Sequence, residues 1–265
     1  MSTNFGIPIL PGAGIASPGV ISDSASLGLL SPEVSTYTGD DAVGYVRKFI
    51  KNIPTDDIKV IAVDEINARM WRYLPWRWTV AGLTAIPLVD GTQDYGSTPT
   101  DYFRLTKARI ARTDVSPVEF GDPLDVLTQL EPKLGKAHPN YVRAISYEGH
   151  LRDGAPFRLE RAVSLPTGAT YEIRGEYQIA AAKIADTSQA LPFPDMYFSV
   201  FLAGLKWKFM EFVADARAGS SQSRKGDTAM SGARSDFESE LYQMAMAEGF
   251  AAGDVISPSE SLWGE

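Results

Sequence analysis

The chain has 265 residues, of which 44% are hydrophobic and 22% charged, a composition typical of a folded protein with a sizeable core. Its net charge of −8 argues against a general nucleic-acid binder, because such a protein needs surplus lysine and arginine to displace counterions. The absence of cysteine excludes disulfides, thiol nucleophiles and iron–sulfur or zinc–thiolate sites.

The first segment, residues 1–38, is rich in glycine, serine and proline and carries only two charges, Asp23 and Glu33. It has no basic residue ahead of its apolar residues, so it makes a poor signal peptide, and we expect a soluble, non-secreted protein. Disordered tails usually avoid apolar residues, whereas this segment repeats them. We therefore expect an extended arm that lies on another surface, which points to an assembly. The residues expected to make the arm contacts include Ile7, Ile9 and Leu10.

Residues 39–75 predict a pair of helices. Asp40 is the expected N-cap of the first helix, and apolar residues follow it at helical spacing. Thr55 is the expected cap of the second helix, whose first turn contains Asp56 and Asp57. The apolar stripe expected on the second helix is Ile58, Ile61, Ala62, Ile66, Met70 and Tyr73.

In residues 76–185 the helical spacing of apolar residues gives way to short β-branched and aromatic runs separated by turn residues. This pattern predicts a mostly antiparallel β domain between two sets of helices. "VDGTQ", residues 89–93, is a hairpin-type turn signal, and "GDPLDVLTQL", residues 121–130, predicts one short helix within the block.

Residues 190–249 predict a second pair of helices. The first of them opens at "LPFPD" and is apolar nearly all round, so it should be central or shared with a neighbour. The last helix should end at Gly249, and a tail, residues 250–265, follows with an isolated Trp263. The apolar face predicted for the last helix is Met230, Ala233, Phe237, Leu241 and Met244.

The order of these segments predicts an α+β fold: a helical bundle of about four helices with an inserted β domain, plus an N-terminal arm and a C-terminal tail.

No catalytic, cofactor-binding or metal-binding residue is predicted. The two histidines, His138 and His150, lack the His-x-x-x-His spacing of a metal site and are interpreted as solvated loop residues. Two carboxylate pairs lie at expected helix starts, and the third, Asp64 and Glu65, is expected on a solvated face. Two acids of the β domain could still pair in space, as they do in glycosidases.

The stretch "MWRYLPWRW", residues 70–78, has two possible roles. Aromatic rings interleaved with arginines can stack on bases and hold phosphates. They can also form a hinge where a helix passes into a sheet and buries its widest side chains. The residues concerned are Trp71, Arg72, Trp76, Arg77 and Trp78.

Four stretches follow one another in a recognisable order. The first is the end of the acid-capped helix, "ARMWRYLPWRWTV". The others are "LVDGTQDYGSTPTDYFRLTKARI", "FRLERAVSLPTGATYEIRGEYQIAAAKI" and "LPFPDMYFSVFLAGLKWKFMEFVAD". This succession resembles the head-to-tail adaptor (connector, or tail tubular) proteins of tailed bacteriophages over roughly residues 40–250. The shared pattern is a Trp-rich helix end, a "P-x-D-Y/F" step, a "P-x-x-x-x-Y-x-I-x-G-x-Y" strand and a "P-F-P-D" helix start. The arm, residues 1–38, is not part of this pattern, so its partner stays open.

The resemblance implies a non-enzymatic structural virion protein without a cofactor. Such proteins form rings, typically of twelve subunits, that bind the portal, carry the tail nozzle and line the DNA ejection channel. The resemblance favours a packing hinge at the Trp-rich stretch, with Arg72 and Arg77 at a subunit boundary. It also implies that genomic DNA passes through the channel without specific binding. Connectors of this kind often wait for the portal as a template, so the resemblance leaves open whether the free protein is a monomer.

The resemblance also implies that the C-terminal tail docks on the portal ring, although Trp263 could instead fold back on its own bundle. The residues expected to dock are Phe250, Val255, Ile256 and Trp263. Two alternatives remain: a β-rich tail component that binds or hydrolyses carbohydrate, and a nucleic-acid-binding module centred on the Trp-rich stretch.

Overall fold

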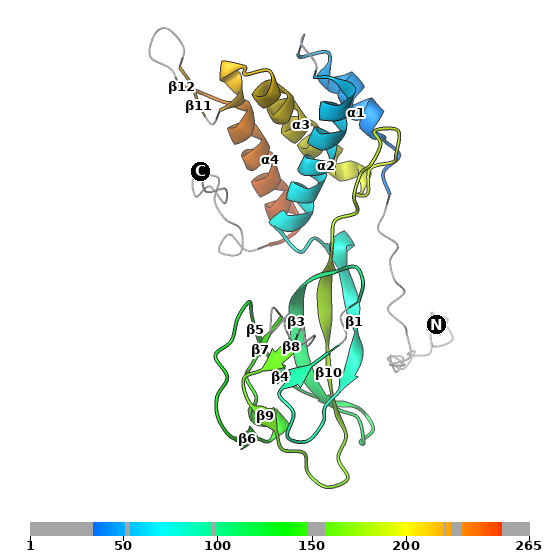
Figure 1. Cartoon of the computed structure of the whole chain (residues 1–265), viewed down its shortest axis with the longest axis vertical. Coiled ribbons are helices and arrows are strands. Elements are labelled where there is room, and N and C mark those ends of the chain that lie inside the picture. The colour runs from blue at the N-terminus through cyan, green and yellow to red at the C-terminus, as the bar shows by residue number, and fades with distance from the viewer. Residues whose placement is uncertain are drawn as a thin grey trace, which may run out of the picture.

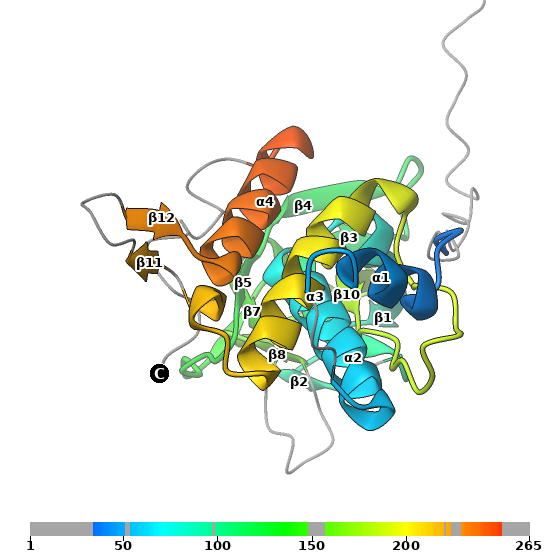
Figure 2. The ribbon, with the colours of Figure 1, turned by 90° about the horizontal axis from the view of Figure 1, so that it is seen from above.

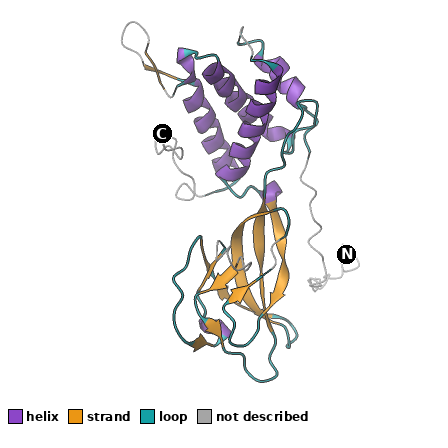
Figure 3. Cartoon of the chain, in the orientation of Figure 1, coloured by secondary structure: helices purple, strands orange, loops and turns teal. Residues whose placement is uncertain are grey.

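The computed structural model describes residues 34–50, 54–96, 99–147, 157–219, 221–223 and 229–250. The four α-helices gather at one end of the molecule and the larger sheets at the other (Figure 1, Figure 3). The prediction of a mixed α+β chain is confirmed. Several residues singled out in the sequence lie outside the described residues: Ile7, Ile9, Leu10, His150, Val255, Ile256 and Trp263.

Helix α1, Gly39–Val46, begins two residues earlier than the predicted cap implies. Its N-cap is Thr38, whose hydroxyl accepts a hydrogen bond from the Asp41 amide, while the Asp41 carboxylate accepts one from the Thr38 amide. The prediction that Asp40 caps this helix is wrong, because only Thr38 and Asp41 have the spacing of a reciprocal capping box. The Asp40 carboxylate instead accepts a 2.7 Å hydrogen bond from the Thr187 hydroxyl.

Helix α2, Asp56–Tyr73, follows Thr55 as predicted, although the Thr55 side chain makes no capping hydrogen bond. The predicted stripe is wrong at Ile61, which is 55% exposed. The buried face is turned from the predicted one, because the segment after the β region covers this side and the Asn67 amide donates to the Ala182 carbonyl at 2.8 Å. The buried face consists of Ala62, Val63, Ile66, Asn67, Met70 and Trp71.

Helix α3, Phe198–Phe212, lies among the other three helices, as Figure 2 shows from above. A short 3₁₀ turn, Asp195–Tyr197, leads into it. Most of its residues are buried, and it contacts α1, α2 and α4, so the prediction of a central helix is confirmed.

Helix α4, Ala233–Ala247, ends before Gly249, whose positive φ of 86° suits glycine at a helix end. The prediction that Met230 belongs to this helix is wrong, because Met230 lies in a short hairpin of β11, Ser221–Ser223, and β12, Ala229–Ser231. The buried face of α4 is Ala233, Phe237, Leu241 and Ala245.

Two four-stranded sheets make up most of the other end of the described fold. The antiparallel sheet has the strand order β1-β10-β3-β4, and the mixed sheet has the order β2-β8-β7-β5 with β5 and β7 parallel. The strands of the first sheet are β1 Val80–Pro87, β10 Tyr171–Ile179, β3 Tyr102–Arg112 and β4 Glu119–Pro123. Those of the second are β2 Asp94–Tyr95, β8 Phe157–Leu159, β7 Ala144–Ser146 and β5 Asp125–Leu127. A parallel pair, β6 Lys136–Ala137 and β9 Ala162–Val163, completes this end.

The helix predicted in residues 121–130 is wrong, because β4 and β5 occupy this stretch. Pro123 is tolerated in β4, since this strand is at the edge of its sheet. The backbone amide of Leu124 donates to the Ala108 carbonyl on β3, and that of Asp125 donates to the Arg143 carbonyl just before β7. These backbone partners override the local helical pattern.

The turn predicted in residues 89–93 exists, with Gly91 at a φ of 74° and a 3.1 Å hydrogen bond from the Thr92 amide to the Val89 carbonyl. It is not a hairpin, because β1 before it pairs with β10 and β2 after it pairs with β8. The turn therefore carries the chain from one sheet to the other.

The fold has two hydrophobic cores, one among the helices and one between the sheets. Ile179, the last residue of β10, packs against both. The ends of the two cores meet where α2 passes into β1, which is the Trp-rich stretch.

Candidate interaction site at the helix–sheet junction

The three tryptophans of residues 70–78 lie inside the fold. Trp71, Trp76 and Trp78 are 1%, 0% and 9% exposed. Trp71 and Trp78 meet edge to face with ring centroids 4.9 Å apart, and both Trp76 and Trp78 pack edge to face on Tyr197, at 5.3 and 5.2 Å. Rings enclosed in this way have no face open for a base, so the packing interpretation explains their position.

Local chemistry fixes this arrangement. Pro75 lacks an amide hydrogen and disfavours a helical conformation at Leu74, which is extended with φ −143° and ψ 161°. The chain then folds back, and the Trp76 indole donates a 2.6 Å hydrogen bond to the Met70 carbonyl in the last turn of α2. Trp76 thereby satisfies a carbonyl that the end of a helix leaves without a partner.

Gln178 connects the sheet to the end of this helix. It is fully buried on β10, and its amide nitrogen donates to the Trp71 carbonyl and, at 2.9 Å, to the Leu74 carbonyl. Its amide oxygen accepts a 2.7 Å hydrogen bond from the Arg104 guanidinium. Because every one of these groups is polar and buried or half-buried, the bridge ties the two cores together in one orientation. Gln178 could not be singled out from the sequence, because it occupies one of the alternating polar positions of "YEIRGEYQI", residues 171–179.

The two arginines of the stretch are exposed, unlike the tryptophans. The Arg72 guanidinium lies 6.0 Å from the Phe103 ring, at a cavity of about 260 Å³ also lined by Trp71 and Lys183. The assignment of Arg72 and Arg77 to a subunit boundary stays a prediction.

Phe250, the first residue of the predicted tail, lies against the same junction. Its ring meets the Trp76 ring edge to face at 6.0 Å, and its amide donates to the Ala245 carbonyl at 3.1 Å. Close by, burial and then the Glu248 carboxylate raise the pKa of the Tyr197 hydroxyl above its ordinary value. The tail therefore leaves the described fold from the junction, with Phe250 seated on its own chain.

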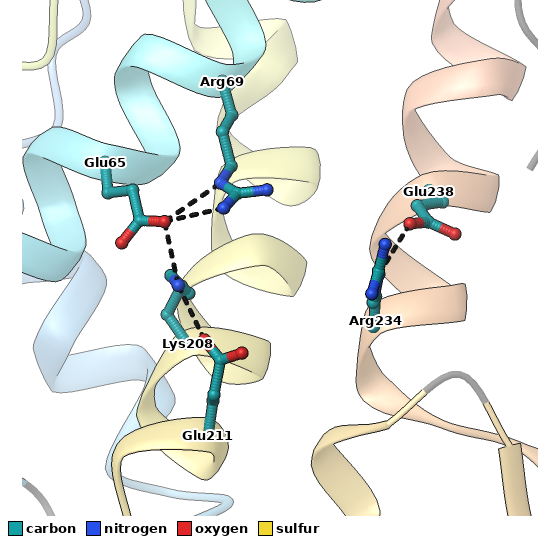
Figure 4. Close-up of polar contacts among 6 residues, drawn as sticks. All are labelled: Glu65, Arg69, Lys208, Glu211, Arg234 and Glu238. Atoms are coloured by element: carbon teal, nitrogen blue, oxygen red, sulfur yellow. Dashed lines mark hydrogen bonds and ion pairs between the residues drawn. The ribbon is translucent and has the colours of Figure 1, made fainter. Parts of the chain in front are cut away.

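A charged cluster ties α2 to α3, and a separate ion pair lies within α4, as Figure 4 shows. The Lys208 ammonium on α3 lies 2.8 Å from Glu65 on α2 and 2.6 Å from Glu211, and Arg69 contacts Glu65 at 2.7 Å. Burial raises the pKa of Glu65, but the hydrogen bonds from Lys208 and Arg69 outweigh it and lower that pKa. On α4, Arg234 pairs with Glu238 at 2.9 Å.

The cluster surrounds the buried ring of Trp207. The cationic groups of Arg69, Lys208 and Arg234 lie 5.0, 5.2 and 5.8 Å from its ring, within the range of cation–π attraction. The interpretation of Asp64 and Glu65 as a solvated pair is wrong, because Glu65 faces α3 and the Asp64 carboxylate accepts a 2.7 Å hydrogen bond from the Ile184 amide. The apolar spacing alone could not show which partners cover this side of α2.

A cavity of about 580 Å³ at the starts of α1 and α2 brings three carboxylates together. Each has a structural partner: Asp40 accepts from the Thr187 hydroxyl at 2.7 Å, Asp56 pairs with Lys59 at 2.5 Å, and Asp186 accepts from the Ser188 amide at 2.7 Å. Within the described ranges, no group of three or more metal-ligating side chains is placed to hold an ion. These carboxylates stabilise local structure.

His138 is half-buried, so its interpretation as a solvated loop residue is wrong. Its ring packs edge to face with Tyr141 and Tyr171, at 6.0 and 5.9 Å, and its Nδ1 accepts a 3.2 Å hydrogen bond from the Asn140 amide. It caps a short 3₁₀ turn, Pro139–Tyr141.

A protein-family model described as SU10 adaptor protein matches residues 27–253, from before α1 to just after α4. The chain belongs to the SU10 adaptor protein family. It is therefore a structural adaptor protein of a bacteriophage and a virion component, and the predicted resemblance is confirmed. The family is not an enzyme family, and an adaptor interacts with portal and tail components. No curated protein matches the chain. In the part of this SU10 family member that the structure describes, no helix is both long and apolar enough to cross a membrane.

Proposed function

We propose that this SU10 adaptor protein forms a ring, of twelve subunits as in the proteins it resembles, that joins the portal to the tail nozzle and lines the channel for DNA. The observation that carries this proposal is the family match, which runs through both hydrophobic cores and the junction between them. A connector must hold the ring above it and the ring below it in a fixed relative position. Gln178 and the tryptophans hold the two cores of the subunit in one orientation, which suits that task.

Each part of the chain has a role in this proposal. The helices of residues 39–75 and 190–249 form one bundle, and residues 76–185 form a β domain inserted between its halves. The contacts of α3 with α1, α2 and α4 support this division. Residues 1–33 of the arm and residues 251–265 of the tail make contacts outside the subunit, whereas Ser35, Thr36 and Phe250 contact their own chain.

DNA passes through the channel without specific binding. The chain has a net charge of −8, and its junction tryptophans are buried, so neither general phosphate attraction nor base stacking at the junction is favoured. Arg72 and Arg77, exposed beside the junction, are the residues that we place at the boundary between subunits.

The tail docks on the portal through Val255, Ile256 and Trp263, with Phe250 at its root. A wide apolar side chain near the end of a segment gains most when it fills a pocket on a partner. The half-buried Phe250 on Trp76 supports a root held at the junction, from which the tail extends.

The test of the connector role uses particles assembled without this protein. They should package DNA but fail to retain it, and they should lack normal tails, as counted by electron microscopy. A version supplied in trans should restore both. Particles that retain DNA and carry normal tails without the protein would rule out the proposal.

A further inference from the structure

An open groove runs along the outer side of α1 and α3. One half is a cavity of about 130 Å³ lined by Tyr45, Val46, Phe49, Leu202, Ala203 and Lys206. The other half, about 300 Å³, shares Phe49 and Lys206 and continues past Met210 toward the start of α4. We call these two adjacent cavities the α1–α3 groove.

The α1–α3 groove exposes aromatic surface. Phe49 is 68% exposed and Tyr45 is 42% exposed. The Tyr45 ring meets the Phe198 ring edge to face, with centroids 5.7 Å apart, and the Tyr37 ring stacks on the Phe198 ring at 4.0 Å. The exposed rings of Tyr45 and Phe49 line the same cavity, and exposed apolar side chains that gather in this way mark an interaction site.

The chain itself contains a segment with matching chemistry. In "NFGIPILPG", residues 4–12, Pro8 and Pro11 flank aliphatic side chains. Proline holds such a segment extended, so little conformational entropy is lost when it docks, and proline-rich extended segments bind grooves lined by aromatic rings. Residues 1–33 carry two acids and no lysine or arginine, whereas Lys48 and Lys206 lie at the groove.

We propose that Ile7–Leu10 of a second copy of this chain docks in the α1–α3 groove, so that each arm binds the neighbouring subunit. This assigns the arm a partner and goes beyond the proposed function; only its placement between neighbours in the assembled particle rests on the ring.

The arm is long enough to reach a neighbour. Ser35 and Thr36 are held on the Asp195 carboxylate by three hydrogen bonds of 2.5, 2.8 and 2.7 Å, just before α1. The α1–α3 groove begins beside the other end of α1, and this helix of eight residues is only about 12 Å long. The residues between Leu10 and Val34 can span up to about 80 Å when extended. The arm is therefore several times longer than the path to its own groove, and long enough to cross to another subunit.

The first test measures binding to the isolated chain. A fluorescent peptide with the sequence of residues 4–12 is titrated into the full chain carrying Ile7→Asp, Ile9→Asp and Leu10→Asp, so that no arm competes for the groove. Saturable binding is expected, and adding Phe49→Asp should weaken it at least tenfold. Leu134→Asp, at a residue that is 96% exposed in the β region, should leave binding unchanged.

Two outcomes of this titration overturn the proposal: no binding to the chain with an intact groove, or equal binding with Phe49→Asp. Circular dichroism of each variant checks that it is folded, and a folded Phe49→Asp chain is expected because the side chain is mostly exposed. Since no portal or particle is present, a failure here is distinct from a failure of the connector role.

The second test asks which copy supplies the arm, and it uses the absence of native cysteine. Particles are assembled from a mixture of chains with Ala203→Cys and chains with a cysteine at residue 7, 9 or 10. Under mild oxidation, at least one of these pairs should give a disulfide-linked dimer on a non-reducing gel. Chains with Leu134→Cys in place of Ala203→Cys should give none. No dimer from any pair, together with a disulfide inside single chains that carry both cysteines, would overturn the assignment to a neighbour.

Discussion

Trp76 shows how one side chain holds several elements at the junction. Its ring is fully buried, packs on Tyr197 and Phe250, and donates a hydrogen bond to the Met70 carbonyl. Trp76→Ala should lower the free energy of unfolding by about 3–5 kcal/mol, measured by urea denaturation, because it leaves a large cavity and an unpaired carbonyl. Trp76→Phe should recover part of the loss. A Trp76→Ala protein with wild-type stability but altered DNA binding would instead favour base stacking.

At the scale of the element, close packing of the helices depends on Gly204 in α3. A methyl group at this position would lie 2.8 Å from both the Ile66 and the Phe237 side chains, closer than real Cβ contacts. Gly204→Ala should therefore push α2 and α4 away from α3 and lower the free energy of unfolding by about 1–3 kcal/mol.

Gly44 in α1 provides the matched control. A methyl group there would meet nothing within 4 Å, so Gly44→Ala should stabilise the protein by about 0.5–1 kcal/mol through the greater helix propensity of alanine. Thermal melts of both variants give the comparison. Equal shifts of the two melting temperatures would show that the contact between the helices is looser than the structure indicates.

The charged cluster makes the stability of these helices depend on pH. The pKa of Glu65 is lowered from its ordinary value of 4.5, so the folded protein binds a proton there less readily than the unfolded chain does. The stabilisation is therefore present above pH 4.5 and is lost as the pH falls through the lowered pKa.

Glu65→Gln should thus lower the free energy of unfolding by about 1–2 kcal/mol at pH 7, and the difference from the wild type should shrink below pH 4.5. Denaturation in urea at several pH values measures it. Glu240→Gln, at an exposed residue of α4, controls for the loss of one charge. A difference that stays constant down to pH 3 would assign the effect to packing.

For the whole molecule, the tail can be separated from the fold. Deletion of residues 251–265 keeps Phe250 on Trp76 and should leave the melting temperature unchanged while it abolishes binding to the portal. Phe250→Ala in the full chain is the complementary variant, and it should lower the melting temperature because its ring packs on the junction. Full portal binding by the truncated protein would rule out docking through the tail.

Much of this protein was determined by local sequence. Pro75 and Gly249 end their helices because of their own backbone chemistry, and the all-round apolar surface of α3 required a central position. The succession of a Trp-rich helix end, strands and an "LPFPD" helix start also indicated the protein family. These features depend on residues that are neighbours along the chain, so a reader of the sequence can find them.

Only the tertiary structure decided the features whose partners lie far along the chain. Residues 121–130 became strands because Ala108 and Arg143 offered backbone partners, and Glu65 was enclosed because Lys208 of another helix reached it. Gln178 acquired its role from carbonyls about a hundred residues away at the end of α2. Which groups meet across such separations depends on how the helices and sheets pack together, and no local pattern encodes it.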